Sequence, residues 1–322
     1  MTSLDARAPL LALVVPCYNE EGILQQTRDR LVACLVEAAQ SGIISAESYI
    51  CFVDDGSTDA TWTLIRSFCA SSNRVRGIKL SRNFGHQLAL LAGLLRVKDN
   101  CDCSVSIDAD LQQDERVIPE FIDAYRKGAD IVSGVRRDRA TDGAVKRFTA
   151  EAFYRLMSML GITIIRNHAD YRLLSRRALI ALAQFHESNI FLRGLVHYIG
   201  FNKATVYFDV KDRQAGESKY TFRKMLSFAL TGITSFTVAP LRVIAVIGIV
   251  FTAVSVVMSG YVLVRRFFFS DVVPGWASTV LPIYLLGGIQ LLAIGVIGEY
   301  VGRAYLETKS RPRYIVEDDL FG

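Results

Sequence analysis

The chain has 322 residues, of which 51% are hydrophobic and 21% are charged, and its formal net charge at neutral pH is +5. This length allows one or two domains, and the composition is too apolar for an ordinary soluble enzyme. Charged residues are common up to about residue 224 and are then absent from two long runs. No nucleic-acid-binding motif is present, and the positive charge suits an anionic membrane surface.

The first part of the chain alternates short apolar runs with helical patterns. We expect strands within residues 10–18, 48–59, 75–83, 103–110 and 129–137, and helices within residues 19–40, 56–70, 85–97 and 115–128. Asn19 is predicted to be the N-cap of the first helix, with Glu20 and Glu21 in its first turn. Strands that alternate with helices of ten or more residues predict βαβ units and a mainly parallel α/β sheet.

Polar clusters follow each of the five expected strands. They are Tyr18-Asn19-Glu20, Asp54-Asp55, Ser81-Arg82-Asn83, Asp108-Ala109-Asp110 and Arg136-Arg137. Ordinary loop polarity explains each cluster singly but not the whole set. Because ligands of open α/β sheets bind at the carboxyl ends of the strands, we expect one site at this rim.

Asp108 and Asp110 are two carboxylates at a strand end, and Gln112 adds an amide oxygen. Such hard oxygen ligands suit Mg²⁺ or Mn²⁺ bound together with a diphosphate. The alternative is a pair of solvated turn acids. Asp114 and Glu115 are expected to begin the next helix, where negative charge complements the helix dipole. The phosphate-binding motifs G-x-G-x-x-G and G-x-x-x-x-G-K-[ST] are both absent, which argues against a dinucleotide fold and a P-loop.

Two uncharged runs predict membrane-spanning helices, Val243–Val264 and Val272–Gly298. No signal peptide is recognised, so we expect the N-terminal domain to stay in the cytoplasm. Two spans would return the basic tail to the same side, as the positive-inside rule requires, although Arg265 and Arg266 would flank the outer loop. The six cysteines all lie in the first 103 residues, and we expect reduced thiols in the core.

Several segments together resemble a family 2 glycosyltransferase of GT-A fold. They are "VVPCYNEEGIL", "VDDGSTDAT", "LSRNFGHQLALLAGL" and "SIDADLQQDERVIPEFI". Downstream, "NHADYRLLSRRAL", "AGESKYTFRKML" and the two expected spans are similar to the polyprenyl-phosphate branch of that family. This branch includes dolichyl-phosphate mannose synthases and bacterial bactoprenol glucosyltransferases. The resemblance covers nearly the whole chain.

The resemblance implies a role for each matching residue. The residues implied to bind the nucleotide sugar are Pro16, Tyr18, Glu20, Asp54, Asp55, Asp108, Ser218 and Lys219. Those implied to bind the metal are Asp108, Asp110 and Gln112. The catalytic set is Asp110, Asp170, Arg136, Arg147 and Arg213, with the arginines meeting phosphates and Arg172 beside the acceptor. Asp170 is the candidate if a base is used, and otherwise a structural partner of Arg172 or Arg176. No meaning is assigned to His168.

The implied reaction is an inverting transfer of glucose from UDP-glucose to undecaprenyl phosphate. GDP-mannose, aminoarabinose donors and an inactive nucleotide-sugar binder stay open as alternatives. A processive polysaccharide synthase is disfavoured because no Q-x-x-R-W motif is present.

The expected organisation is a Rossmann-like GT-A nucleotide-sugar domain (1–220), an interfacial amphipathic helix (221–239), two transmembrane helices (240–302) and a cytoplasmic tail (303–322). Arg193 and the Arg223-Lys224 pair, each set among apolar residues, indicate helices in the membrane interface, or else plain core helices. The resemblance implies a location in the inner (cytoplasmic) membrane, with the catalytic domain in the cytoplasm. It also implies assembly as a homo-tetramer.

Overall fold

The computed structural model describes residues 7–110, 112–136, 168–187, 192–209 and 276–321, with scattered positions between 241 and 257. The chain forms two compact units. The first contains residues 1–155, 163–220 and 312–322, and the second contains residues 156–162 and 221–311.

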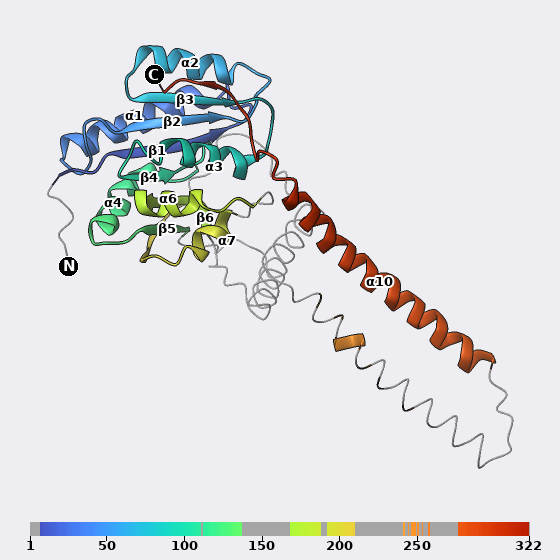
Figure 1. Cartoon of the computed structure of the whole chain (residues 1–322). Helices are drawn as coiled ribbons and strands as arrows, with labels where there is room; N and C mark the ends of the chain where they lie inside the picture. The colour runs from blue at the N-terminus through green and yellow to red at the C-terminus, as the bar shows by residue number, and fades with distance from the viewer. Residues whose placement is uncertain are drawn as a thin grey trace, which may run out of the picture. The chain divides into compact units, whose positions relative to one another are not determined.

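The first unit is built on an eight-stranded sheet whose order is β7-β5-β6-β4-β1-β2-β3-β8 (Figure 1). The strands are β1 (Leu11–Cys17), β2 (Tyr49–Asp54), β3 (Val75–Leu80), β4 (Cys103–Ser106), β5 (Ile131–Arg136), β6 (His168–Ser175), β7 (Lys203–Phe208) and β8 (Val316–Asp319). Strand β1 pairs in parallel with β2 and β4, β2 with β3, and β5 with β7. Strands β6 and β8 are antiparallel to their neighbours. All five predicted strands are confirmed, as is the α/β class.

Helices connect these strands as the alternating pattern predicts. They are α1 (Leu24–Gln40), α2 (Thr61–Ser71), α3 (His86–Val97), the 3₁₀ turn η1 (Glu115–Val117), α4 (Ile118–Arg126), α6 (Arg176–Ala183) and α7 (Leu192–Tyr198). Asp114 caps η1 by accepting the Arg116 N–H, and Glu115 lies in its first turn, so these two acids begin the next helix as expected.

The predicted N-cap of the first helix is wrong. Asn19 has a φ of 55°, and its Oδ1 accepts the Thr58 N–H at 2.9 Å instead of an N–H of its own helix. Helix α1 begins at Leu24, five positions later. Asn tolerates the left-handed conformation, and here its side chain joins the loops that follow β1 and β2.

The core lies around the central parallel strands. Every residue of β1 and of β2 is buried, as expected for parallel strands covered by helices on both faces. Helix α3 lies close to these strands at Gly93, where a Cβ would come within 2.4 Å of Val14 Cγ1. All six cysteines are free thiols, and burial raises the thiol pKa of each. Four of them are buried as expected for core residues, whereas Cys34 and Cys69 are partly buried against the core.

The C-terminal segment of the chain belongs to the first unit. Strand β8 pairs with β3 at the sheet edge, and the Leu320 N–H donates to Gly77 O at 2.8 Å (Figure 1). Nearer the rim, the Ser81 N–H donates to Ile315 O at 3.0 Å, and Arg313 donates to Phe185 O at 2.7 Å. The expected tail therefore contributes an edge strand to this sheet.

The second unit contains α10 (Trp276–Thr308), a helix of 33 residues. Among the positions that the structure describes, no helix has both the length and the apolar character needed to cross a membrane. Most of the run Val243–Val264 and all of residues 221–239 lie outside the described residues.

Candidate active site

The sheet order brings the predicted rim clusters to one place. Strand β1 lies between β2 and β4, which is the topological switch point where open α/β sheets bind ligands. Strand β6 is antiparallel to both β4 and β5, so β4 and β5 point the same way and β6 begins at their carboxyl ends. The residues after β1, β2 and β4 and the first residues of β6 therefore share this rim.

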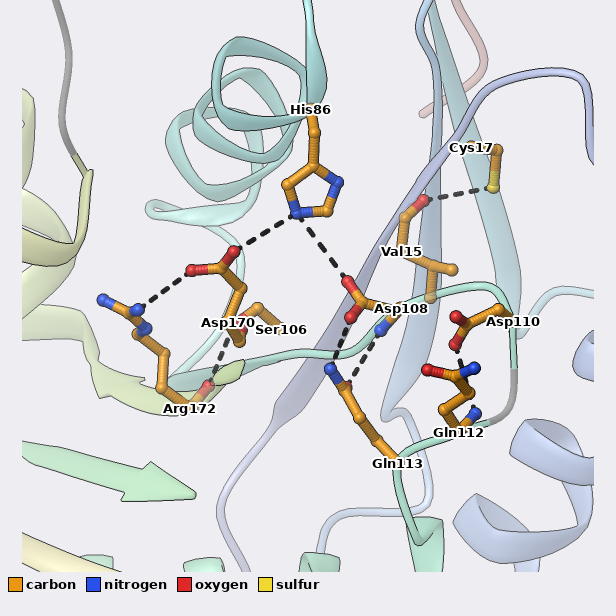
Figure 2. Close-up of polar contacts among 10 residues, drawn as sticks. All are labelled: Val15, Cys17, His86, Ser106, Asp108, Asp110, Gln112, Gln113, Asp170 and Arg172. Carbon is orange, nitrogen blue, oxygen red and sulfur yellow. Dashed lines mark hydrogen bonds and ion pairs between the residues drawn. The ribbon is translucent and has the colours of Figure 1, made fainter. Parts of the chain in front are cut away.

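Asp108 is held in place by a neighbouring amide side chain. The Asp108 N–H donates to Gln113 Oε1 at 3.0 Å, and Gln113 Nε2 donates to Asp108 Oδ2 at 2.6 Å (Figure 2). Gln113 is only 1% exposed, so it is fixed by its own surroundings. This double contact sets the orientation of the Asp108 carboxylate.

Asp110 follows in a turn. Its Oδ1 accepts the Gln112 N–H at 3.1 Å, and both residues are partly exposed (Figure 2). Within the described segments, no three His, Cys, Asp or Glu side chains form a group that could hold a metal ion by themselves. Mg²⁺ is commonly held by one or two carboxylates plus substrate phosphates, so the Asp108 and Asp110 oxygens fit a metal that binds with a nucleotide. The ligand role of Gln112 stays a prediction.

His86 lies between two carboxylates that come from different strands. Its Nε2 is 3.7 Å from Asp108 Oδ1 and 3.5 Å from Asp170 Oδ2 (Figure 2). His86 is the first residue of α3, and Gly85 before it has a φ of 94°, which favours glycine. The imidazole thus links the predicted metal site with the predicted acceptor side.

Asp170 also pairs with a buried arginine. Arg172 Nη2 lies 3.1 Å from Asp170 Oδ1, and the two side chains are 3% and 11% exposed. The Ser106 hydroxyl donates to the carbonyl oxygens of both residues, which ties the start of β6 to the end of β4. The structural pairing that was the alternative to a base role is present, and both Asp170 oxygens have nitrogen neighbours.

The acids after β2 are buried. Asp55 is 2% exposed, and its two oxygens accept the N–H groups of Phe84 at 2.7 Å and of Gly85 at 2.9 Å. Asp54 is fully buried and its Oδ1 accepts the Ser57 N–H at 3.3 Å, whereas its Oδ2 has no hydrogen-bond partner among the described residues. Burial raises the pKa of both carboxyl groups.

The structure describes only some of the remaining predicted residues. Pro16 is buried within β1, Tyr18 is 44% exposed at the rim, and the Glu20 N–H donates to Thr61 Oγ1 at 2.9 Å. Arg136 ends β5 and is half-buried. Arg147, Arg213, Ser218 and Lys219 lie outside the described residues, so their roles stay predictions.

Sequence reasoning missed two residues of this site, His86 and Gln113. His86 stands three positions after the third polar cluster, at the start of a helix, and this position was its one available signal. Gln113 stands beside Gln112, and nothing in the sequence distinguishes which of the two amides contacts Asp108.

Comparison with known proteins identifies the family of the chain. The family model described as Glycosyl transferase family 2 matches residues 12–182. An uncharacterized glycosyltransferase, YkoT of Bacillus subtilis, is 48% identical over 97% of this chain and 93% of its own length. The bactoprenol glucosyl transferase of Shigella phage SfX is 38% identical over 95% of this chain and 98% of its own. A prophage bactoprenol glucosyl transferase homolog of Escherichia coli K12 is 37% identical over the same shares.

The family model spans more than half of the chain and includes every element that forms the site, from β1 to α6. The similarity to the curated relatives extends over nearly all of the rest. The resemblance seen in the sequence motifs is therefore confirmed: the chain belongs to glycosyl transferase family 2, and its relatives include proteins named bactoprenol glucosyl transferase.

Proposed function

We propose that this protein transfers glucose from UDP-glucose to a polyprenyl phosphate, with inversion at the sugar carbon and with Mg²⁺ or Mn²⁺ bound. The observation that carries the proposal is the pair Asp108 and Asp110 at the switch point of a family 2 sheet. The names of the relatives support both the glucosyl group and the bactoprenol acceptor.

The donor side is formed by the carboxyl ends of β1, β2 and β4. The buried acids Asp54 and Asp55 are proposed to face the nucleoside, with Tyr18 at the exposed rim. Asp108 and Asp110 would hold the metal beside the diphosphate. When bound, the metal supplies positive charge that stabilises the departing nucleoside diphosphate. Gln113 keeps the Asp108 carboxylate oriented for this task.

The acceptor needs little activation. A phosphate monoester is ionised near neutral pH, since its second pKa is about 6, so it can attack the sugar without a strong base. Both oxygens of Asp170 have nitrogen neighbours in Arg172 and His86. This pairing favours an ordering role for Asp170 over proton abstraction. We propose that Arg136, Arg147 and Arg213 meet the phosphate groups, since arginine grips phosphate with paired donors.

We further propose that the protein is anchored in the cytoplasmic membrane, with its catalytic unit in the cytoplasm. The support is compositional, from the uncharged runs Val243–Val264 and Val272–Gly298 and from the basic tail. A polyprenyl acceptor resides in a membrane, which agrees with such an anchor. Alkaline carbonate extraction of membranes that contain the full chain tests this part, since release into the supernatant would contradict it.

The reaction is tested with purified full-length protein in detergent, undecaprenyl phosphate, Mg²⁺ and radiolabelled UDP-glucose. We expect label to enter an organic-extractable lipid. GDP-mannose assayed in parallel decides between the two donors. Transfer from GDP-mannose alone would replace glucose by mannose in the proposal.

Asp110→Asn is the matched variant for the metal assignment, because it keeps the size of the side chain and removes its charge. We expect it to abolish transfer. Near-normal rates in that variant would contradict the metal role of Asp110. Tight UDP binding by the wild type without any lipid product would instead support the inactive nucleotide-sugar binder.

A further inference from the structure

We propose that His86 is a positioning residue that presents the metal-site carboxylate of Asp108 and ties it to the acceptor-side acid Asp170. This inference rests on the proposed function, because it takes Asp108 and Asp110 as the metal site. It assigns a role in the reaction to a residue outside the predicted metal and catalytic sets.

Asp108 is fixed from two sides. Gln113 holds Oδ2 at 2.6 Å, and the His86 imidazole faces Oδ1 at 3.7 Å. The buried Gln113 amide holds Oδ2 through a hydrogen bond, and the imidazole adds a longer polar contact at Oδ1. Carboxylates that bind metals depend on such outer contacts for their orientation.

His86 also contacts the acceptor-side acid Asp170. Its Nε2 is 3.5 Å from Asp170 Oδ2, and the other Asp170 oxygen pairs with buried Arg172. The contacts form one continuous row in the order Arg172, Asp170, His86, Asp108 and Gln113 (Figure 2). Arg172 and Gln113, at the two ends of this row, are buried. The His86 side chain at its centre is 46% exposed, so a ligand can reach the imidazole.

The chemistry of the ring suits this place. Nε2 faces two carboxylate oxygens, so the proton of a neutral ring is assigned to Nε2, and a charged ring carries one there as well. An N–H group between two carboxylates offsets their mutual repulsion and keeps Asp108 at a fixed separation from Asp170. Without it, Asp108 would lose the contact at Oδ1 and keep the Gln113 contact at Oδ2.

The test measures how strongly Mn²⁺ tightens the binding of UDP, using titration calorimetry of the full-length protein with and without Mn²⁺. The ratio of the two Kd values for UDP reports metal binding without any turnover. Loss of an outer contact of a metal ligand typically weakens metal binding or activity by about 10–100-fold. We expect His86→Ala to reduce the Mn²⁺ enhancement at least about 10-fold and to leave metal-free UDP binding unchanged.

Two further variants control for folding and for surface effects. His86→Gln keeps an N–H donor near the position of Nε2 and is expected to recover most of the enhancement. His186→Ala removes an exposed histidine just after α6 and should match the wild type.

The outcomes separate this inference from the proposed function. If Asp110→Asn abolishes the Mn²⁺ enhancement and His86→Ala does not change it, the role of His86 is refuted and the metal site stands. If the wild type shows no Mn²⁺ enhancement, the metal site itself is refuted, and this inference with it. Loss of metal-free UDP binding in both His86 variants would also contradict the proposal, since His86 would then act on the nucleotide and not through Asp108.

Discussion

Asp55→Ala tests how the rim of the sheet positions the helix that carries His86. In the wild type, the two Asp55 oxygens accept the N–H groups of Phe84 and Gly85, which directly precede His86. The variant removes both acceptors at once. We therefore expect the loop between β3 and α3 to open more readily, and the start of α3 with it.

The size of the effect follows from these contacts. A buried N–H that loses its acceptor costs about 1–3 kcal/mol, so two give about 2–6 kcal/mol. Two features reduce this range. Phe84 and Gly85 are half-buried, so water can replace part of the loss. Burial of the Asp55 charge also costs free energy in the wild type, as its raised pKa indicates. We expect a net loss of about 2 kcal/mol for Asp55→Ala, and about half of that for Asp55→Asn, which keeps one acceptor oxygen.

Hydrogen–deuterium exchange of the full-length protein measures this loss locally. A change of about 2 kcal/mol corresponds to roughly 30-fold faster exchange of the amides of residues 84 and 85. Asp123→Ala is the matched control, because Asp123 is an exposed acid on α4 that pairs with Lys127 just after the helix. Exchange of these two amides in Asp55→Ala at the rate of the control would refute the reasoning.

Three further predictions concern the same sheet. Because burial raises the folded-state pKa of Asp54 above 3.8, the contribution of Asp54 to stability falls as the pH rises through the interval above 3.8. Urea unfolding should therefore show that Asp54→Asn becomes more stable relative to the wild type between acid and neutral pH, and a constant difference would contradict this. Gly56→Ala places a Cβ 2.4 Å from the Arg82 carbonyl carbon at a φ of 66°, and should cost at least about 1–3 kcal/mol by the same measurement. Removal of residues 312–322 uncovers the edge of β3 and should cause aggregation, which size-exclusion chromatography detects. Asp319→Ala breaks only an exposed pair with Arg96 and should lower the free energy of unfolding by at most about 1 kcal/mol.

The parallel part of the fold was predictable from the sequence. Strands buried on both faces appear as continuous apolar runs, and β1 and β2 are such strands. Since parallel strands end at one edge, their polar ends had to meet there. The position of the site could therefore be predicted before any of its contacts.

Strands β6 and β8 could not be recognised in this way. Strand β6 carries Asp170 and Arg172, two charged residues that pair with each other and interrupt any continuous apolar run. Strand β8 has the sequence Val-Glu-Asp-Asp, and two of its acids pair with Lys79 and Arg96, far away in the sequence. Charged residues are typical of edge strands, but alone they indicate a loop.

The register of β6 explains why the polar contacts of the site were beyond sequence reasoning. Tyr171 is fully buried, its ring lies 4.8 Å from that of Phe121 and 5.3 Å from that of Phe208, and its hydroxyl donates to Asp114 O. Because side chains alternate along a strand, this aromatic cluster holds Tyr171 on one face and places Asp170 and Arg172 on the other.

A shift of β6 by one residue would exchange these faces. It would remove Tyr171 from its aromatic cluster and bring the charges of Asp170 and Arg172 into that apolar cluster, and both changes are costly. The packing of Tyr171 on one face of the sheet thus places Asp170 on the other face, beside His86. Asp170 and Arg172 stand close together in the sequence. The aromatic partners of Tyr171 that fix the register of β6, Phe121 and Phe208, lie almost ninety residues from each other. Pairing of His86 with Asp108 and Asp170 is therefore a consequence of core packing, and substitutions in that core should disturb the site even where they touch none of its polar atoms.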